Sequence, residues 1–199
     1  MQEKGFFICI EGLDGCGKTT QARLLVERLR QNYKAVYTAE PSHGKIGRFI
    51  RQYCLLGKKR LSSVVEALLF AADRFEHLER EVLPALKRGK LVVSDRYVYS
   101  SLAYQGGGGT DLEWIEKINE HAMRPHLAIF IDVDPEIVLK RLKREKSVME
   151  SLETQQKVRE VYMKFVEKGE LVKIDGNKPK REVANEILKV VLNFLEGAH

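Results

Sequence analysis

Short apolar runs alternate with longer amphipathic stretches from one end of the chain to the other. The runs are rich in β-branched and aromatic residues, which is typical of buried strands, and they cover residues 6–11, 35–39, 91–95, 127–131 and 171–174. Because strands that alternate with helices usually pair in parallel, the pattern predicts an α/β fold with a five-stranded parallel sheet and helices on both faces. No internal repeat or linker interrupts the pattern, so we expect a single domain over residues 1–199.

The segments between these runs have apolar residues at helical spacing. We expect helices over about residues 18–31, 46–53, 62–87, 114–121 and 181–195, and one that opens at Pro135. Gly89 lies just past the end of the long helix 62–87, and Pro84 falls in its last turn, where a proline can kink the chain. Residues Gly106–Gly109 are expected to form a glycine loop.

The first apolar run leads straight into GLDGCGKT, which fits the pattern G-x-x-x-x-G-K-[ST] at every fixed position. The alternative is a plain glycine turn with a solvated lysine, and the strand–loop–helix context argues against it. Backbone N–H groups and the helix N-terminus would hold the phosphates of a nucleoside triphosphate. Lys18 would reach the β- and γ-phosphates, and the Thr19 hydroxyl would hold Mg²⁺. The expected ATP-binding residues are Gly12, Leu13, Asp14, Gly15, Cys16, Gly17, Lys18, Thr19 and Thr20.

Composition narrows the class of protein. A chain of 199 residues with 44% hydrophobic content can bury a full core. No apolar run is long enough to span a bilayer and no export signal opens the chain, so we expect no membrane partner. The cysteines at positions 9, 16 and 54 are expected to be reduced thiols in a cytoplasmic protein. Cys16 lies near a helix N-terminus, which could lower its pKa.

The net charge of +6 could indicate nucleic acid, an anionic surface or small polyanionic substrates. The basic residues are spread among glutamates, with little aromatic interleaving. This distribution favours solvated faces and a phosphate-binding cleft over a nucleic-acid partner.

Three charged residues near the ends of predicted strands are further candidates for the binding site. Asp95 closes an apolar strand, where open parallel sheets place their ligands, and it could hold Mg²⁺ opposite Thr19 or cap the next helix. Arg96 offers a fork of donors to a phosphate, with a structural ion pair as the alternative. Asp14 lies inside an anion-binding loop, so it should accept from a sugar hydroxyl, meet the metal or point to solvent.

Phe70 and Arg74 lie four residues apart and therefore on one helix face. A ring and a guanidinium displayed together could stack on a base and donate to its edge. The alternative places Phe70 in the core and pairs Arg74 with Glu66 or Glu76.

Four segments together resemble the thymidylate kinases, which are P-loop nucleoside monophosphate kinases: EGLDGCGKTTQ, Glu40-Pro41, LLFAADR at 68–74 and DRYVYSSLAYQG at 95–106. Their order and spacing match that family from the N-terminus to about Gly108. The resemblance implies a three-layer P-loop NTPase fold and transfer of the ATP γ-phosphoryl group to dTMP, which gives dTDP for dTTP biosynthesis. It also implies Mg²⁺ and a homodimer in the cytoplasm.

By this resemblance the matching residues take roles around dTMP. Phe70 would stack on thymine, Arg74 would donate to its O4, and Gln105 would approach the base edge. Tyr104 would crowd the 2′ side of the sugar, and Asp14 would accept from the 3′-hydroxyl.

The resemblance also assigns the phosphate end of the pocket. Arg96 and Arg51 would hold the dTMP phosphate, and the corner Glu40-Pro41 would shape that pocket, with a cis peptide left open.

Gly15 stands where some family members carry an arginine, so the chain resembles the lid-arginine branch of the family. The lid is expected at about residues 141–156, with Arg144 as the first candidate for the acting cation and Arg141 as the second. A solvated helix face is the alternative. With Lys18 and Arg96, these arginines are the expected catalytic residues. The lid of that branch usually includes an Asp-Arg-x-Glu-like stretch, and Ser147-Val148-Met149-Glu150 stands here instead.

Two other functions remain open. One is a P-loop kinase for another nucleoside monophosphate or a deoxynucleoside. The other is a nucleotide-driven switch or ATPase. The segment 177–180 disfavours this class, because NKPK lacks the aspartate of the guanine-reading N-K-x-D motif.

Overall fold

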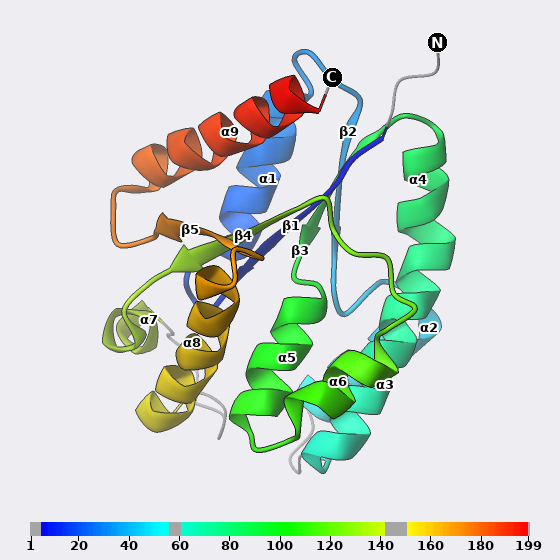
Figure 1. Cartoon of the computed structure of the whole chain (residues 1–199), viewed down its shortest axis with the longest axis vertical. Coiled ribbons are helices and arrows are strands. Elements are labelled where there is room, and N and C mark those ends of the chain that lie inside the picture. The colour runs from blue at the N-terminus through cyan, green and yellow to red at the C-terminus, as the bar shows by residue number, and fades with distance from the viewer. Residues whose placement is uncertain (1–4, 56–60, 142–150, 199) are drawn as a thin grey trace.

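One parallel sheet organises the molecule (Figure 1). The computed structural model describes residues 5–55, 61–141 and 151–198. Within them the strands form a five-stranded sheet in the order β2-β3-β1-β4-β5, and every pair is parallel. The strands are β1 (Phe7–Gly12), β2 (Ala35–Ala39), β3 (Leu91–Asp95), β4 (Leu127–Asp132) and β5 (Val172–Asp175). The predicted parallel sheet is confirmed.

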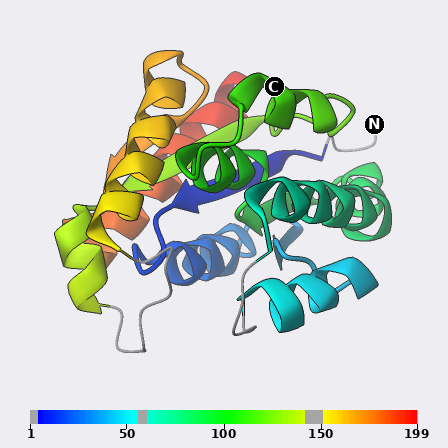
Figure 2. The same ribbon diagram turned by 90° about the horizontal axis from the view of Figure 1, so that it is seen from below.

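Helices cover both faces of the sheet, as predicted. They are α1 (Lys18–Leu29), α2 (Lys45–Ile50), α3 (Ser63–His77), α4 (Leu83–Lys87), α5 (Val98–Gly107), α6 (Leu112–Ile118), α7 (Pro135–Arg141), α8 (Leu152–Glu167) and α9 (Lys180–Gly197), with π-helical turns η1 (Arg51–Leu55) and η2 (Leu78–Val82). Helix α1 packs with α9, and α5 packs with α8. Figure 2 shows α1 and α5 on opposite sides of β1, so the fold has three layers. None of the described helices is long and apolar enough to cross a membrane.

The centre of the sheet explains where a ligand can bind. Every residue of β1 and β3 is buried, because helices cover these strands on both sides. The parallel register pairs Ile10 of β1 with Asp95 of β3, and Gly12 of β1 with Ile131 of β4. The loop after β1 therefore opens beside the carboxyl ends of both neighbouring strands, which is where open α/β sheets bind ligands.

The long helix predicted over 62–87 is interrupted. Its first part, α3, has Ser62 as N-cap, and the Ser62 hydroxyl accepts from the Val65 N–H at 3.4 Å. The widened turn η2 then separates α3 from α4, just before Pro84. Because proline has no N–H, the carbonyl four residues earlier loses its usual donor and the turn opens.

The glycine stretch 106–109 is half helix and half turn, which corrects the first half of our prediction: Gly106 and Gly107 end α5, and Gly108 and Gly109 form the turn after it. Helix α5 continues to Gly107. A Cβ on Gly106 would lie 2.3 Å from Leu112 Cδ2, and one on Gly107 would lie 3.3 Å from the Val158 backbone N. These glycines therefore allow α6 and α8 to approach α5 closely, and their role is packing rather than a turn.

Helix ends also differ from the prediction where capping decides them. Helix α1 ends at Leu29 instead of Gln31. Helix α6 begins at Leu112, ahead of the predicted Trp114, because the Asp111 carboxylate caps it and accepts from the Trp114 N–H at 2.7 Å.

Candidate active site

The loop after β1 has the backbone of a phosphate-binding loop. Gly12 has φ +149°, and a Cβ there would lie 2.9 Å from the Ile131 carbonyl oxygen. Gly17, with φ +101°, precedes the first residue of α1. Only glycine adopts such angles readily, so the loop can wrap inward and end at a helix N-terminus. The Lys18 side chain is buried, and its Nζ donates to the Leu13 carbonyl at 2.8 Å across the loop.

Thr19 and Asp95 face each other across the end of the sheet. The Thr19 hydroxyl donates to Asp95 Oδ2. The other carboxylate oxygen, Oδ1, is buried and has no hydrogen-bond partner in the described part of the chain. A buried carboxylate oxygen without a partner is costly, and a hard cation would satisfy it. The pair therefore fits Mg²⁺, which is commonly bound by one carboxylate, a hydroxyl and the phosphates of its substrate.

A second cluster joins the phosphate loop to the segment after β3. Arg96 has φ +73°, an unusual angle for a residue other than glycine. Its Nη2 donates to Asp14 Oδ1, and its guanidinium lies 4.9 Å from the centre of the Tyr104 ring. Burial raises the pKa of Asp14, but Arg96 and Lys18 outweigh that effect and hold it well below its ordinary value. Tyr104 also accepts from the Asp14 N–H at 2.8 Å.

A fully buried carboxylate that we did not single out from the sequence supports this cluster. Glu11 ends the apolar part of β1 and accepts from the Tyr97 N–H at 2.8 Å, the Ser100 hydroxyl at 2.6 Å and the Tyr162 hydroxyl at 3.0 Å. Ser100 in turn accepts from Arg96 Nη1 at 2.9 Å. Burial raises the pKa of Glu11 to about 7, although these hydrogen bonds and Arg96 oppose the shift. A charged residue in an otherwise apolar strand was the signal that could have revealed it.

Arg74 is among the most buried charged residues, with 1% of its surface exposed. Its Nη1 donates to Asn119 Oδ1 at 2.6 Å, and its Nη2 donates to Glu40 Oε2 at 2.7 Å and to the Ser101 hydroxyl at 3.0 Å. Its Nε is buried without a hydrogen-bond partner among the described residues. The alternative pairing with Glu66 or Glu76 is therefore wrong, because Glu40 from another element takes that place.

Glu40 lies between two cationic or titratable side chains. One carboxylate oxygen bonds Arg74, and the other lies 3.2 Å from His77 Nδ1. The His77 Nε2 contacts the Thr38 hydroxyl at 2.6 Å. The peptide before Pro41 is cis. Glu40 thus pairs with the arginine of α3, and its expected role at the pocket for the dTMP phosphate stays a prediction.

Arg51 holds the loop that follows this cis peptide. Its guanidinium donates to the carbonyls of Pro41 and Ser42. Helix α3 fixes the same loop from the other side, since Asp73 accepts from the Ser42 N–H at 2.7 Å and from the Ser42 hydroxyl at 2.6 Å. Glu76 accepts from the backbone N–H groups that begin α2. Asp73 and Glu76 had no sequence signal beyond their helical spacing.

The remaining predicted base-site residues lie on two helices that pack together. Phe70 on α3 is partly exposed, so it is not a core residue, and Gln105 on α5 is buried. A flat ring on one helix and an amide on the other are the components of a slot for a base.

The expectation for Cys16 is contradicted by its burial. Burial raises the pKa of the Cys16 thiol, so the expected lowering is wrong: Cys16 is 4% exposed, and desolvation outweighs the nearby Lys18.

The structure describes only the two ends of the lid expected at 141–156. Arg141 is the exposed last residue of α7, and residues 152–156 open α8. Arg144 lies outside the described residues.

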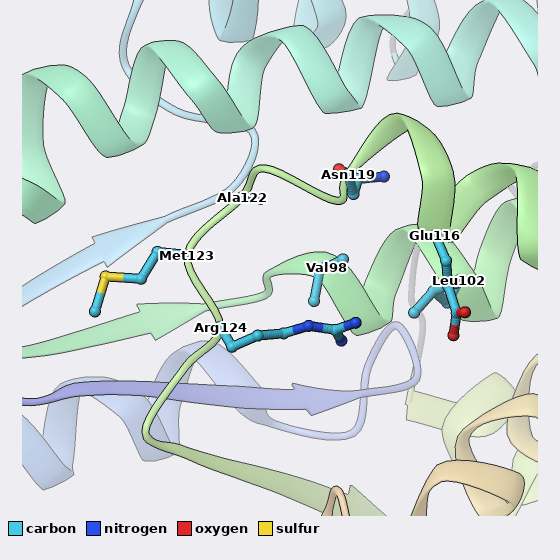
Figure 3. Close-up of a pocket in the computed structure, with 7 residues that line it drawn as sticks. All are labelled: Val98, Leu102, Glu116, Asn119, Ala122, Met123 and Arg124. Carbon is cyan, nitrogen blue, oxygen red and sulfur yellow. The ribbon is translucent and has the colours of Figure 1, made fainter.

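A small hollow elsewhere does not compete with this site (Figure 3). It lies between α5 and α6, and Leu102, Asn119 and Arg124 help to line it. Its volume of about 10 Å³ holds about one water molecule, which is far too little for a nucleotide.

Known proteins place the chain in one family. The family model described as thymidylate kinase matches residues 10–187. A protein named probable thymidylate kinase from Pyrococcus abyssi is 42% identical, over 98% of this chain and 99% of its own length. One of the same name from Methanococcus maripaludis is 44% identical, over 94% and 95%. The match covers the phosphate loop, Asp95-Arg96 and the helix with Phe70 and Arg74, and the chain belongs to the thymidylate kinase family.

Proposed function

We propose that this chain transfers the γ-phosphoryl group of ATP to dTMP and so forms dTDP and ADP. One observation carries the proposal: the Arg74 guanidinium is buried, and its Nε has no hydrogen-bond partner among the described residues. Phe70 lies four residues earlier on the same helix face. A buried donor without a hydrogen-bond acceptor costs about 1–3 kcal/mol of stability, and an acceptor on a bound base would offset that cost.

Base selection follows from the donor character of Arg74. Thymine presents a carbonyl at position 4, which accepts a hydrogen bond. Cytosine presents an amino group there, so two donors would face each other at a cost of about 1–3 kcal/mol. Uracil lacks only a methyl group worth about 0.8 kcal/mol, so it should be rejected less strongly.

The transfer itself depends on positioning and on charge. The acceptor phosphate of dTMP is already a nucleophile, so no strong base is needed. In our proposal Arg96 and Arg51 hold that phosphate, Asp14 accepts from the 3′-hydroxyl, and Tyr104 excludes a 2′-hydroxyl. Lys18 neutralises charge on the transferred group. We propose Arg144 or Arg141 as the further cation from the lid.

We propose that Mg²⁺ accompanies ATP and that Thr19 and Asp95 hold it. When bound, the ion would neutralise the negative charge of the phosphates. The support is the buried Oδ1 of Asp95, which lacks a partner in the described residues. No group of three or more His, Cys, Asp and Glu side chains there could hold a metal by itself, so substrate phosphates would complete the coordination.

One assay tests the base recognition. Turnover with ATP and Mg²⁺ is measured for dTMP, dUMP, UMP, dCMP and AMP, on the wild type and on Arg74→Lys. Lysine keeps a cation against Glu40 but loses the fork of donors. We expect the KM for dTMP to rise at least tenfold while the KM for ATP stays unchanged.

Arg80→Lys is the matched control. Arg80 follows Arg74 in the chain, but it is exposed and pairs with Glu76 at 3.0 Å. A wild type that prefers dCMP or AMP would instead support a kinase for another monophosphate. ATP hydrolysis stimulated by DNA and not by dTMP would support the ATPase.

We also propose a homodimer in the cytoplasm. Exposed apolar side chains gather on α2, η1 and the first half of α3, which we call the α2–α3 patch: Phe49, Tyr53, Val64, Val65 and Leu68. Helices α2 and α3 pack together, so the patch is a surface suited to a second copy. Fractionation of cells tests the location.

A further inference from the structure

Asn119 is a buried amide whose two ends are both committed. It follows the last residue of α6 and is 5% exposed. Its Nδ2 donates to the Ile115 carbonyl at 2.8 Å, so its oxygen is turned the other way, where it accepts from Arg74 Nη1 at 2.6 Å. Figure 3 shows Asn119 at the end of α6, below the helix that carries Arg74.

Arg74 is held by acceptors from separate parts of the chain. Asn119 comes from the end of α6, Glu40 from the segment after β2, and Ser101 from α5. The Tyr97 ring lies 5.2 Å from the guanidinium carbon. A planar guanidinium fixed at both of its Nη groups has no remaining freedom to rotate. Of its three nitrogens, only Nε is buried without a hydrogen-bond partner in the described ranges.

We propose that Asn119 is a positioning residue for base selection: by accepting from Nη1 it holds the Arg74 guanidinium in the orientation that leaves Nε–H for the carbonyl at position 4 of the base. This inference rests on the proposed role of Arg74. Glu40 supplies the opposite charge and Ser101 accepts beside it, but both bond Nη2 and so hold the guanidinium at one end only. Asn119 fixes the other end by accepting from Nη1.

The test separates the two ends of the amide. Asn119→Ala removes the acceptor and the donor, whereas Asn119→Asp keeps an oxygen toward Arg74 and loses the donor to the Ile115 carbonyl. The values of kcat/KM are measured for dTMP, dUMP and dCMP, together with the midpoint of thermal unfolding. For Asn119→Ala we expect the dTMP-to-dCMP ratio to fall about tenfold. The dTMP-to-dUMP ratio should stay within about twofold, because both bases present the same carbonyl.

Asn119→Asp is expected to lose stability and to keep the dTMP-to-dCMP ratio. The matched control is Asn185→Ala on α9, which removes an exposed amide that accepts from Arg28 at 2.7 Å and should change no ratio. If both Asn119 variants lose the ratio in step with their stability, Asn119 only ends α6 and the proposal is overturned. If Asn119→Ala keeps the ratio while Arg74→Lys loses it, Asn119 has no part in selection. If Arg74→Lys also keeps it, the proposed role of Arg74 fails first.

Discussion

Glu11 shows how one buried carboxylate can make stability depend on pH. Its pKa is raised from an ordinary value of 4.5 to about 7, because burial disfavours the charged form. The folded protein therefore binds this proton more tightly than the unfolded chain does. The stabilisation is fully present below pH 4.5 and is lost as the pH rises through about 7. A shift of this size corresponds to on the order of 3 kcal/mol.

The variant Glu11→Gln removes this titration while keeping an acceptor for the Tyr97 N–H. We expect the wild type to lose about 2–3 kcal/mol of unfolding free energy relative to Glu11→Gln between pH 5 and pH 8. Chemical unfolding of both proteins at a series of pH values measures this difference, in which the other titrating groups cancel. Parallel curves over that range would show that Glu11 is charged in the folded protein throughout.

The partners of Asp95 lead to a prediction about metal dependence at a single residue. Asp95→Asn keeps the size of the side chain and an oxygen for Thr19, but it removes the negative charge. Because the charge of a carboxylate is what attracts Mg²⁺, we expect the Mg²⁺ concentration for half-maximal activity to rise at least tenfold. The KM for dTMP should change little. Titrating activity with Mg²⁺ at saturating ATP and dTMP makes the measurement, and an unchanged Mg²⁺ requirement would remove Asp95 from the site.

At the scale of elements, α3 holds the loop that follows β2 and the start of α2. Gly47 on α2 lies so close to the loop held by α3 that a Cβ would meet the Ser42 carbonyl oxygen at 2.1 Å and Asp73 Oδ1 at 2.7 Å. We expect Gly47→Ala to cost about 1–3 kcal/mol of stability. It should also raise the KM for dTMP more than that for ATP, because η1, which carries Arg51, continues α2.

The control for that prediction is Gly197→Ala. Gly197 is also helical, and a Cβ there would have nothing within 4 Å. The free energy of unfolding of Gly197→Ala should differ from that of the wild type by less than about 0.5 kcal/mol. Equal effects of the two substitutions would mean that α2 is not held tightly against α3.

Elements with local signals could be predicted from the sequence, and contacts between distant elements could not. The phosphate loop was predictable because its glycines, lysine and threonine are contiguous, and the strands because their apolar runs are short and bounded. The charge of Glu11 within an apolar run was a local signal, but its partner could not be predicted because Tyr162 is 151 residues away. For Arg74 the helical neighbours Glu66 and Glu76 were considered, yet the pairing carboxylate, Glu40, lies 34 residues upstream.

At the scale of the whole molecule, the α2–α3 patch bears on assembly. Leu68 is 48% exposed and Val64 is 46% exposed, and they lie four residues apart on one face of α3. Nearby on the chain, the rings of Phe49 and Tyr53 lie 4.5 Å apart and are also exposed. A second copy that covered this face would remove the apolar surface from water, at about 25 cal/mol per Å².

We expect the wild type to sediment as a dimer and Leu68→Lys to sediment as a monomer, because a lysine there would be buried without a partner charge. The control is Ile137→Lys on α7, outside the α2–α3 patch, where the replaced side chain is 36% exposed. Sedimentation velocity over a range of concentrations makes the measurement. A wild type that stays monomeric throughout, or a Leu68→Lys variant that associates as tightly as the wild type, would exclude this patch as the interface. Since α3 also carries Phe70 and Arg74, a true interface there should couple assembly to substrate binding, and the monomeric variant should then bind dTMP more weakly.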